Sequence, residues 1–289
     1  MYYDDDTIIF LNGKWIYARE AKTGLYKQSF HYGNGVFEGI RAYATHEGHC
    51  KILKAREHFE RLQYSAEQMY MDLPYSVDEM VQWAYALLAK NNLQDAYIRP
   101  LVFTEENMGL QPENKTNLFM CAWNWGQYFS DLGVNLVTSE FTRPDPRSCR
   151  VEAKVTGHYT NSILALNAAK KQGYDEALLL DQEGFVAEAS GANFFFQKGD
   201  VIFTAPRGNI LPGITRSIVF DLCRENGYTL RETRFKPEDV YDADGAFLTG
   251  TAAEISAVSS LDGIAFKRLW KDTFGYRLQQ QFMHYVRAA

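Results

Sequence analysis

Strand-like and helical stretches alternate along the whole chain, and this alternation constrains the fold more than any other feature of the sequence. Short runs rich in β-branched and aromatic residues predict strands, at 7–11, 14–18, 96–103, 118–123, 134–139, 152–155, 177–181, 185–188, 193–197 and 201–204. Apolar residues at helical spacing predict helices, at 54–69, 77–91, 161–172 and 214–226. The sequence therefore predicts an α+β fold.

Boundary residues support the helices and suggest two domains. Ser76 and Glu79 have the spacing of a capping box at the start of one helix. Gly173 and Gly227 follow two others, where glycine commonly ends a helix. A stretch rich in aromatic, glycine and polar residues separates the two halves. We expect three regions: a small α+β domain over 1–123, a connector over 124–133, and a larger domain over 134–289.

Charge and cysteine content exclude several classes of function. The net charge is −6 and no block of Lys or Arg is present, which argues against a nucleic-acid or membrane partner. The 4 cysteines are scattered without a CxxC pair, so we expect reduced thiols and no metal site. The first residues are acidic, unlike a secretion signal, and no apolar run approaches the ~20 residues of a membrane span. These features predict a cytoplasmic protein.

Lys154 lies in a strand-like segment and has two interpretations. A lysine in a strand normally lies on its solvated face. The alternative is a lysine that forms a Schiff base with an aldehyde, because burial lowers the pKa of its amine and leaves it unprotonated. The residues around Lys154 leave both interpretations open.

Three features could bind a phosphate, although each is weak alone. The segment 211–216 opens a helix after Pro-Gly, so the N–H groups of Ile214 and Thr215 could form an anion cup. The segment 248–253 offers hydroxyl and backbone donors, but an ordinary strand-to-helix loop fits it as well. Arg61 has a guanidinium fork that suits a phosphate, and a solvated surface arginine is its ordinary interpretation.

Tyr97 and Arg99 give a sharper geometric prediction. Side chains alternate across a strand, so these two share one face and Ile98 lies on the other. A tyrosine beside an arginine can hold carboxylates. Pro100 predicts a bulge or an edge position at this point.

Together with further motifs, these residues resemble the branched-chain aminotransferases, which are class IV (fold type IV) pyridoxal-5′-phosphate (PLP) enzymes. The matching segments are 31–41, 57–62, 96–101, 152–154, 188–193, 211–216 and 250–255, with Tyr159 in addition. The similarity runs from about Phe10 to about Ile264. It implies a small N-terminal α/β domain and a larger C-terminal, barrel-like α/β domain that binds PLP.

The resemblance also implies how the cofactor would be held. Lys154 would form a Schiff base with PLP and later move the proton at the substrate Cα. Glu188 would pair with the pyridine nitrogen, and Tyr159 would donate to the phenolic oxygen. The remaining contacts would come from residues at the phosphate and the ring face: Arg61, Ile214, Thr215 and Thr251 at the phosphate, and Leu211 at the ring.

The implied reaction moves the amino group of L-leucine, L-isoleucine or L-valine to 2-oxoglutarate, which yields glutamate. Tyr97 and the backbone of Thr251 and Ala252 would receive the α-carboxylate, and Arg99 the distal carboxylate. Family members form homodimers, and some assemble further. The side-chain pocket would therefore combine residues of two subunits: Phe37, Trp125, Tyr128, the partner's Met108 and the partner's Leu110.

Two segments differ from the commoner family pattern, at 156–158 and 189–191, and both flank the cofactor residues. D-amino acid aminotransferases, (R)-amine transaminases and aminodeoxychorismate lyases share the fold. The pair Tyr97 and Arg99, with the Gly-Thr-Ala-Ala run, favours the branched-chain family. A catalytically silent PLP-binding protein is an alternative of another class, and the presence of every expected residue speaks against it.

Overall fold

The computed structural model of the chain describes residues 2–111, 115–126, 129 and 133–288, which divide into two compact units. The first unit comprises Met1–Gly126, Ala153–His158 and Val286–Ala289, and the second comprises Gln127–Glu152 and Tyr159–Tyr285. The sequence placed 134–289 in one domain. In the structure, the segment that holds Lys154 groups instead with the first unit.

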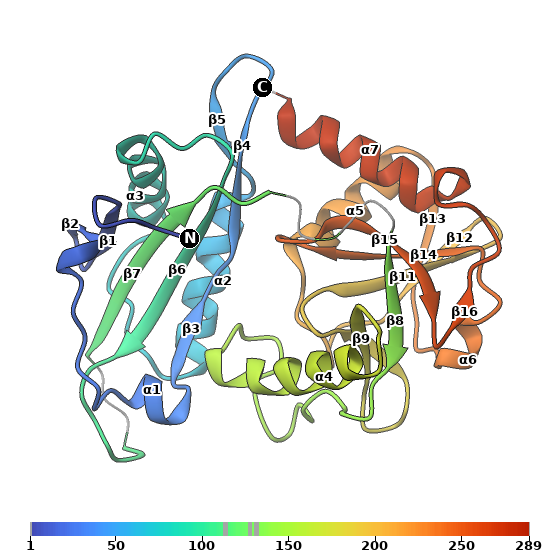
Figure 1. Cartoon of the computed structure of the whole chain (residues 1–289), viewed down its shortest axis with the longest axis horizontal. Coiled ribbons are helices and arrows are strands. Elements are labelled where there is room, and N and C mark those ends of the chain that lie inside the picture. Colours follow the sequence, from blue (N-terminus) through green and yellow to red (C-terminus); the bar gives the residue numbers. More distant parts are fainter. Residues whose placement is uncertain (1, 112–114, 127–128, 130–132, 289) are drawn as a thin grey trace. The chain divides into compact units, whose positions relative to one another are not determined.

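The first unit is built on an antiparallel sheet (Figure 1). Its strands are β1 (Ile8–Leu11), β2 (Lys14–Tyr17), β3 (Gly35–Phe37), β4 (Ile40–Ala44), β5 (Cys50–Ile52), β6 (Ala96–Thr104) and β7 (Thr116–Trp123). Among the described residues they form seven strands in the order β2-β1-β7-β6-β4-β5, and β3 also pairs with β6.

Two helices cover one face of this sheet and bury its core. They are α2 (Ala55–Gln68) and α3 (Val77–Lys90), and a short helix, α1 (Gln28–Tyr32), precedes β3. Figure 1 shows α2 and α3 behind the strands. Phe59 and Leu62 of α2 are fully buried with Ile98 of β6 in one apolar cluster. The other face of β6 and β7 is left to carry functional side chains.

The second unit contains a curled sheet and several helices. Its strands are β8 (Val134–Thr138), β9 (Glu176–Leu180), β10 (Val186–Ala189), β11 (Asn193–Lys198), β12 (Val201–Thr204), β13 (Thr229–Glu232), β14 (Gly245–Gly250), β15 (Glu254–Leu261) and β16 (Ile264–Ala265). Their order is β10-β9-β8-β15-β14-β11-β12-β13, with β16 beside β15. The helices are α4 (Tyr159–Lys171), α5 (Ile214–Glu225), α6 (Pro237–Val240) and α7 (Phe274–Arg287). The predicted α+β class is thus confirmed.

Several helix ends lie where local signals predict them. Ser76 Oγ accepts from Glu79 N at 3.2 Å, and Glu79 Oε2 accepts from Ser76 N at 2.8 Å, so the predicted capping box is present. Gly173 and Gly227 take the left-handed backbone, with φ of 86° and 68°, just after α4 and α5. This backbone favours glycine, which explains why both helices stop there.

Two predictions about strands are wrong. Residues 152–155 form a turn, and their pairing with β3 is limited to a single bridge between Val36 and Val155. Pro100 lies on β6, an interior strand, so it is not at an edge. It faces the interruption between β3 and β4, and the pairing on both sides keeps one register, so no bulge is present.

In the described parts of the chain, none of the helices has the length and apolar character needed to cross a membrane.

Candidate active site

Lys154 is held at its backbone by two elements of the first unit. Its N–H donates to Ser65 Oγ of α2 at 3.0 Å, and its carbonyl accepts from Phe37 N at 3.1 Å. The side chain is half-buried, and Nζ lies 4.9 Å from the centre of the Phe37 ring. Helix α2 and strand β3 therefore fix where the Lys154 amine emerges.

Glu38 forms a buried cluster with Arg61 and His58 in the same unit. Arg61 donates through Nε to Glu38 Oε1 at 2.6 Å and through Nη2 to Oε2 at 2.9 Å. His58 Nδ1 lies 2.7 Å from Glu38 Oε2. Burial alone would raise the pKa of Glu38, but the charge of Arg61 and the hydrogen bonds hold it well below its usual range. Glu38 is therefore a carboxylate.

Tyr97, Arg99, Phe37 and Trp125 gather on the open face of the first sheet. Arg99 Nη2 lies 3.5 Å from the Tyr97 hydroxyl, as the strand alternation predicts. The Arg99 guanidinium lies 4.8 Å from the Phe37 ring centre, and the rings of Tyr97 and Trp125 are 4.4 Å apart. A Cβ at Gly39 would overlap the Tyr97 hydroxyl, so this position needs glycine.

A cavity of about 590 Å³ within the first unit is lined by Arg99, Trp123 and Trp125, among others. Arg99 Nε and Trp123 Nε1 are buried there and have no hydrogen-bond partner among the described residues. Buried donors without a partner are costly. Two such donors beside one cavity suit a bound carboxylate.

Glu188, on β10 of the second unit, is surrounded by donors. Arg143 Nη2 lies 2.9 Å from Glu188 Oε1, and both side chains are more than nine-tenths buried, with 8% and 6% exposed. Asn193 Nδ2 donates to Oε2 at 2.9 Å, and Leu211 N lies 3.1 and 3.2 Å from the two oxygens. These donors favour the ionised carboxylate.

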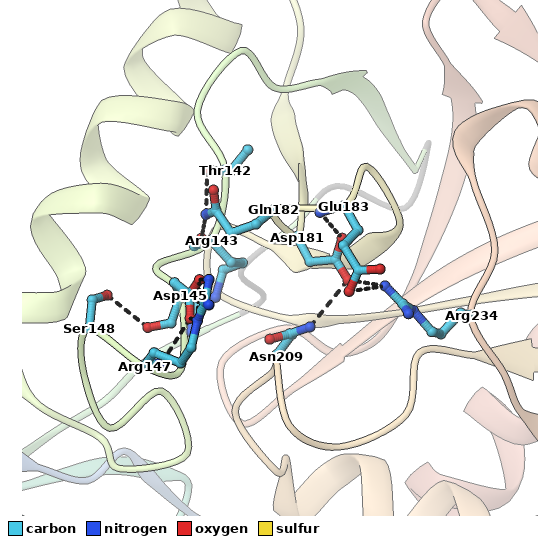
Figure 2. Close-up of polar contacts among 10 residues, drawn as sticks. All are labelled: Thr142, Arg143, Asp145, Arg147, Ser148, Asp181, Gln182, Glu183, Asn209 and Arg234. Atoms are coloured by element: carbon cyan, nitrogen blue, oxygen red, sulfur yellow. Dashed lines mark hydrogen bonds and ion pairs between the residues drawn. The ribbon is translucent and has the colours of Figure 1, made fainter.

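Hydrogen bonds from the turn between β9 and β10 hold the loop that carries Arg143 in place (Figure 2). Gln182 Nε2 donates to Thr142 Oγ1 at 2.9 Å and to the Arg143 carbonyl at 2.8 Å. Asp181 Oδ2 accepts from Asn209 Nδ2 at 3.1 Å, which holds the loop that leads to Leu211. One turn thus supports two of the groups that contact Glu188.

The N-terminus of α5 has the form of an anion site. Gly213 precedes the helix, and no side chain caps it, which leaves the N–H groups of Ile214 and Thr215 at the first turn. A Cβ at Gly213 would overlap Asn193 Oδ1. Asn193 Nδ2 also donates to the Leu211 carbonyl at 2.9 Å, so it links this helix start to Glu188.

The remaining predicted residues lie as follows. Tyr159 begins α4, and Thr251 and Ala252 lie in the turn between β14 and β15; all three are half-buried. In β14, the hydroxyl of Thr249 is buried without a hydrogen-bond partner among the described residues. Tyr128 lies outside the described residues. In the parts of the chain that are described, no group of His, Cys, Asp and Glu is arranged to hold a metal ion.

Comparison with known proteins decides the family. The family model for amino-transferase class IV matches residues 35–261. The branched-chain-amino-acid aminotransferase of Pseudomonas aeruginosa is 43% identical over 266 residues, which cover 90% of this chain and 86% of that protein.

This chain belongs to the class IV branched-chain aminotransferase family.

Solved structures of branched-chain aminotransferases agree with this assignment. The Escherichia coli enzyme has a TM-score of 0.94 and 35% identity, and the match covers 98% of this chain and 96% of that one. The enzyme of Thermoproteus uzoniensis with norvaline has a TM-score of 0.93 and 34% identity, over 97% and 95% of the two chains. The predicted fold type IV architecture is therefore confirmed.

The sequence analysis missed several residues that support this aminotransferase site. Glu38, Ser65, Arg143 and Asn193 each bind a predicted residue, and His58 binds Glu38. Glu38 and Ser65 carried no local signal beyond being polar positions inside apolar segments. His58 and Asn193 are polar residues close in sequence to Arg61 and Glu188, which was the signal available for them, whereas Arg143 carried none.

Proposed function

We propose that this chain transfers the amino group of L-leucine, L-isoleucine or L-valine to 2-oxoglutarate, with PLP as its cofactor on Lys154. The observation that carries the substrate class is the position of Phe37. Its ring lies 4.9 Å from the Lys154 amine and 4.8 Å from the Arg99 guanidinium. An apolar ring beside an arginine can accept either an isobutyl group or a carboxyethyl group near the reacting amine.

Residues of each unit offer groups that fit PLP. In the first unit these are Lys154 and Arg61; in the second they are Tyr159, Glu188, Leu211, Ile214, Thr215 and Thr251. The fit is supported by the ionised Glu188, which suits a protonated ring nitrogen, and by the uncapped start of α5, which suits a phosphate. When bound, PLP supplies an electron sink for breaking the Cα–H bond.

The chain's own groups would then bind the substrate and move one proton. Lys154 Nζ would take the proton from the substrate Cα and deliver it to the C4′ position of the cofactor. Tyr97 and the backbone of Thr251 and Ala252 would hold the α-carboxylate, while Arg99 would hold the distal carboxylate of 2-oxoglutarate. Arg99 Nε has no hydrogen-bond partner among the described residues, which supports that last role, because an incoming carboxylate would satisfy it.

We also propose a homodimer whose partner completes the side-chain pocket. The first unit exposes a group of large apolar residues: Leu25, Tyr26, Phe30, Tyr32, Met108 and Leu110. Exposed apolar patches of this kind mark association surfaces. The partner's Met108 and the partner's Leu110 would line the pocket with Phe37 and Trp125.

All four cysteines are free thiols, which supports a reducing, cytoplasmic setting.

A substrate comparison tests the proposal. Purified protein with PLP is mixed with 2-oxoglutarate and either L-leucine or D-alanine, and glutamate is measured. We expect glutamate with L-leucine and little with D-alanine. Glutamate with D-alanine alone would indicate a D-amino acid aminotransferase instead. No glutamate with any amino acid, while PLP stays bound, would indicate a silent PLP-binding protein.

A further inference from the structure

We propose that Glu38 and His58 are positioning residues that orient the guanidinium of Arg61 toward the cofactor phosphate. This inference rests on the proposed function, because it takes Arg61 as a phosphate ligand. It assigns a specific task to two buried polar residues that touch neither substrate nor cofactor in the proposed mechanism. All the residues concerned lie in the first unit.

Glu38 places a charge inside an apolar layer. It lies between Val36 and Ile40, which are fully buried members of the first core cluster, and its own side chain is 0% exposed. Burial of a lone carboxylate is expensive, and a buried ion pair is often no more stabilising than well-packed apolar residues. A buried pair is therefore weak evidence of a purely structural role, and we look for a functional one.

The contacts of Glu38 fix the plane of the Arg61 guanidinium. Two parallel donations, from Nε at 2.6 Å and Nη2 at 2.9 Å, form a fork that allows one orientation. His58 contributes a third contact, 2.7 Å from Oε2, which stops the carboxylate from rotating. A freely mobile arginine would lose rotamer entropy when it bound a phosphate, and this cluster removes that cost in advance.

His58 acts as a neutral donor in this cluster. Its side chain is 2% exposed, and burial lowers the pKa of its imidazole despite the opposing effect of Glu38. The nearby charges of Arg61 and Lys154 lower the pKa further. A neutral ring whose Nδ1 lies beside a carboxylate carries its proton on Nδ1. His58 thus holds Glu38 without adding a second positive charge.

Helix α2 joins this cluster to the catalytic lysine. His58, Arg61 and Ser65 follow one another at i, i+3 and i+7, so they share one face of the helix. Ser65 Oγ accepts from the Lys154 backbone N–H at 3.0 Å. One face of α2 therefore fixes the positions of both Arg61 and Lys154. A fixed Arg61 guanidinium holds a bound phosphate at a constant position relative to the Lys154 amine.

Comparing PLP with pyridoxal, which lacks the phosphate, tests the inference on the full-length chain. Dissociation constants for both are measured by titration of the cofactor-stripped protein. In Glu38→Gln the affinity for PLP should fall by about 10- to 100-fold, as when an outer partner of a binding group is removed, while the affinity for pyridoxal stays near the parent value. Glu57→Gln is the matched control, since Glu57 lies on the same helix in an exposed pair with Lys54.

Two further variants separate positioning from folding. His58→Asn keeps a donor near the Nδ1 position and should retain the parent preference for PLP, whereas His58→Leu should lose it. In an Arg61→Ala background, Glu38→Gln should have no additional effect on PLP affinity, because its action passes through Arg61. Melting temperatures of the stripped proteins identify any variant that fails to fold, and the His58 pair then carries the test.

The inference is overturned if Glu38→Gln keeps the parent ratio of PLP to pyridoxal affinity, or if both affinities fall together. It is also overturned if Glu38→Gln still weakens PLP binding without Arg61. Failure of the proposed function would be visible in the parent protein, as no binding of PLP or no glutamate from L-leucine. A parent that binds PLP and makes glutamate, with an unresponsive Glu38, would refute only the inference.

Discussion

Two buried carboxylates, one in each unit, use different kinds of donors. Glu38 is held chiefly by side chains of one helix, Arg61 and His58. Glu188 is held by Arg143 and Asn193 and by the backbone of Leu211, which come from separate segments of the second unit. Both carboxylates are ionised, but the surroundings of the two groups have different roles.

The two carboxylates therefore have different roles: Glu38 orients a neighbouring arginine, whereas Glu188 provides a negative charge. Glu38 also has contacts to His58 and to the Gly39 backbone N–H, but its two donors from Arg61 form a fork, so the carboxylate serves mainly to orient that arginine. Glu188 has donors on several sides and a neighbour, Leu211, that is itself a predicted ring contact. Its environment serves mainly to keep a negative charge in place. Substitutions at the two sites should therefore fail in different ways, which the following predictions exploit.

Removing Arg143 should have the largest effect. Arg143→Ala leaves Glu188 as a buried charge without its ion-pair partner, which typically costs about 3–5 kcal/mol of unfolding free energy. Urea unfolding of the stripped protein measures this loss. Arg147→Ala is the matched control on the same loop, because the Arg147 side chain is 89% exposed. This variant should have the same unfolding free energy as the parent. Equal stability of both variants would show that the Glu188 charge needs no partner.

Glu188→Gln should lower turnover while PLP stays bound. Loss of a fixed charge at the site of developing charge costs about 10²–10³-fold in kcat. Single-turnover absorbance changes with L-leucine, at saturating PLP, measure the proton-transfer step. Glu38→Gln, tested in the same way, should change kcat far less than it changes PLP affinity. If both variants lost kcat equally, the proposed difference between Glu38 as an orienting residue and Glu188 as a source of negative charge would be wrong.

The sequence was informative where a signal was local and uninformative where partners were distant. The capping box of Ser76 and the shared face of Tyr97 and Arg99 depend on neighbouring residues, and both predictions are correct. Glu38 and His58 are 20 residues apart and meet only through the packing of α2 on the sheet. No local pattern reveals such a pair.

Strand prediction failed for a related reason. The segment 152–155 has strand-like residues but lacks a neighbouring strand to pair with along its length. Pairing is a property of the tertiary structure, and composition does not specify it.

Arg99→Lys tests a predicted residue that contacts neither carboxylate. A lysine keeps the charge but loses the fork, so the KM for 2-oxoglutarate should rise about tenfold and the KM for L-leucine should change little. Steady-state kinetics with each substrate varied in turn give the two values. A parallel rise in both would assign Arg99 to general site structure and remove the distal-carboxylate role.

The smallest expected effect is on the pH dependence of stability, and it concerns only the cluster with a histidine. Burial lowers the pKa of His58, so below about pH 6.5 the unfolded chain binds a proton that the folded chain does not. Stability therefore falls as the pH drops through that value. His58→Asn cannot titrate, and its urea-unfolding curves from pH 7.5 to 5 should show a smaller loss than the parent. Parallel curves would mean that His58 binds its proton equally well in the folded and unfolded chain, which would contradict the lowered pKa.

The location of the cofactor bond tests the whole account most directly. The protein is incubated with PLP, reduced with borohydride, digested and mapped by mass spectrometry. We predict the pyridoxyl phosphate mass on the peptide that contains Lys154 and on no other lysine-containing peptide. A label on another lysine, or none on Lys154, would contradict the assignment from which the roles of Glu38, Arg61 and Glu188 follow.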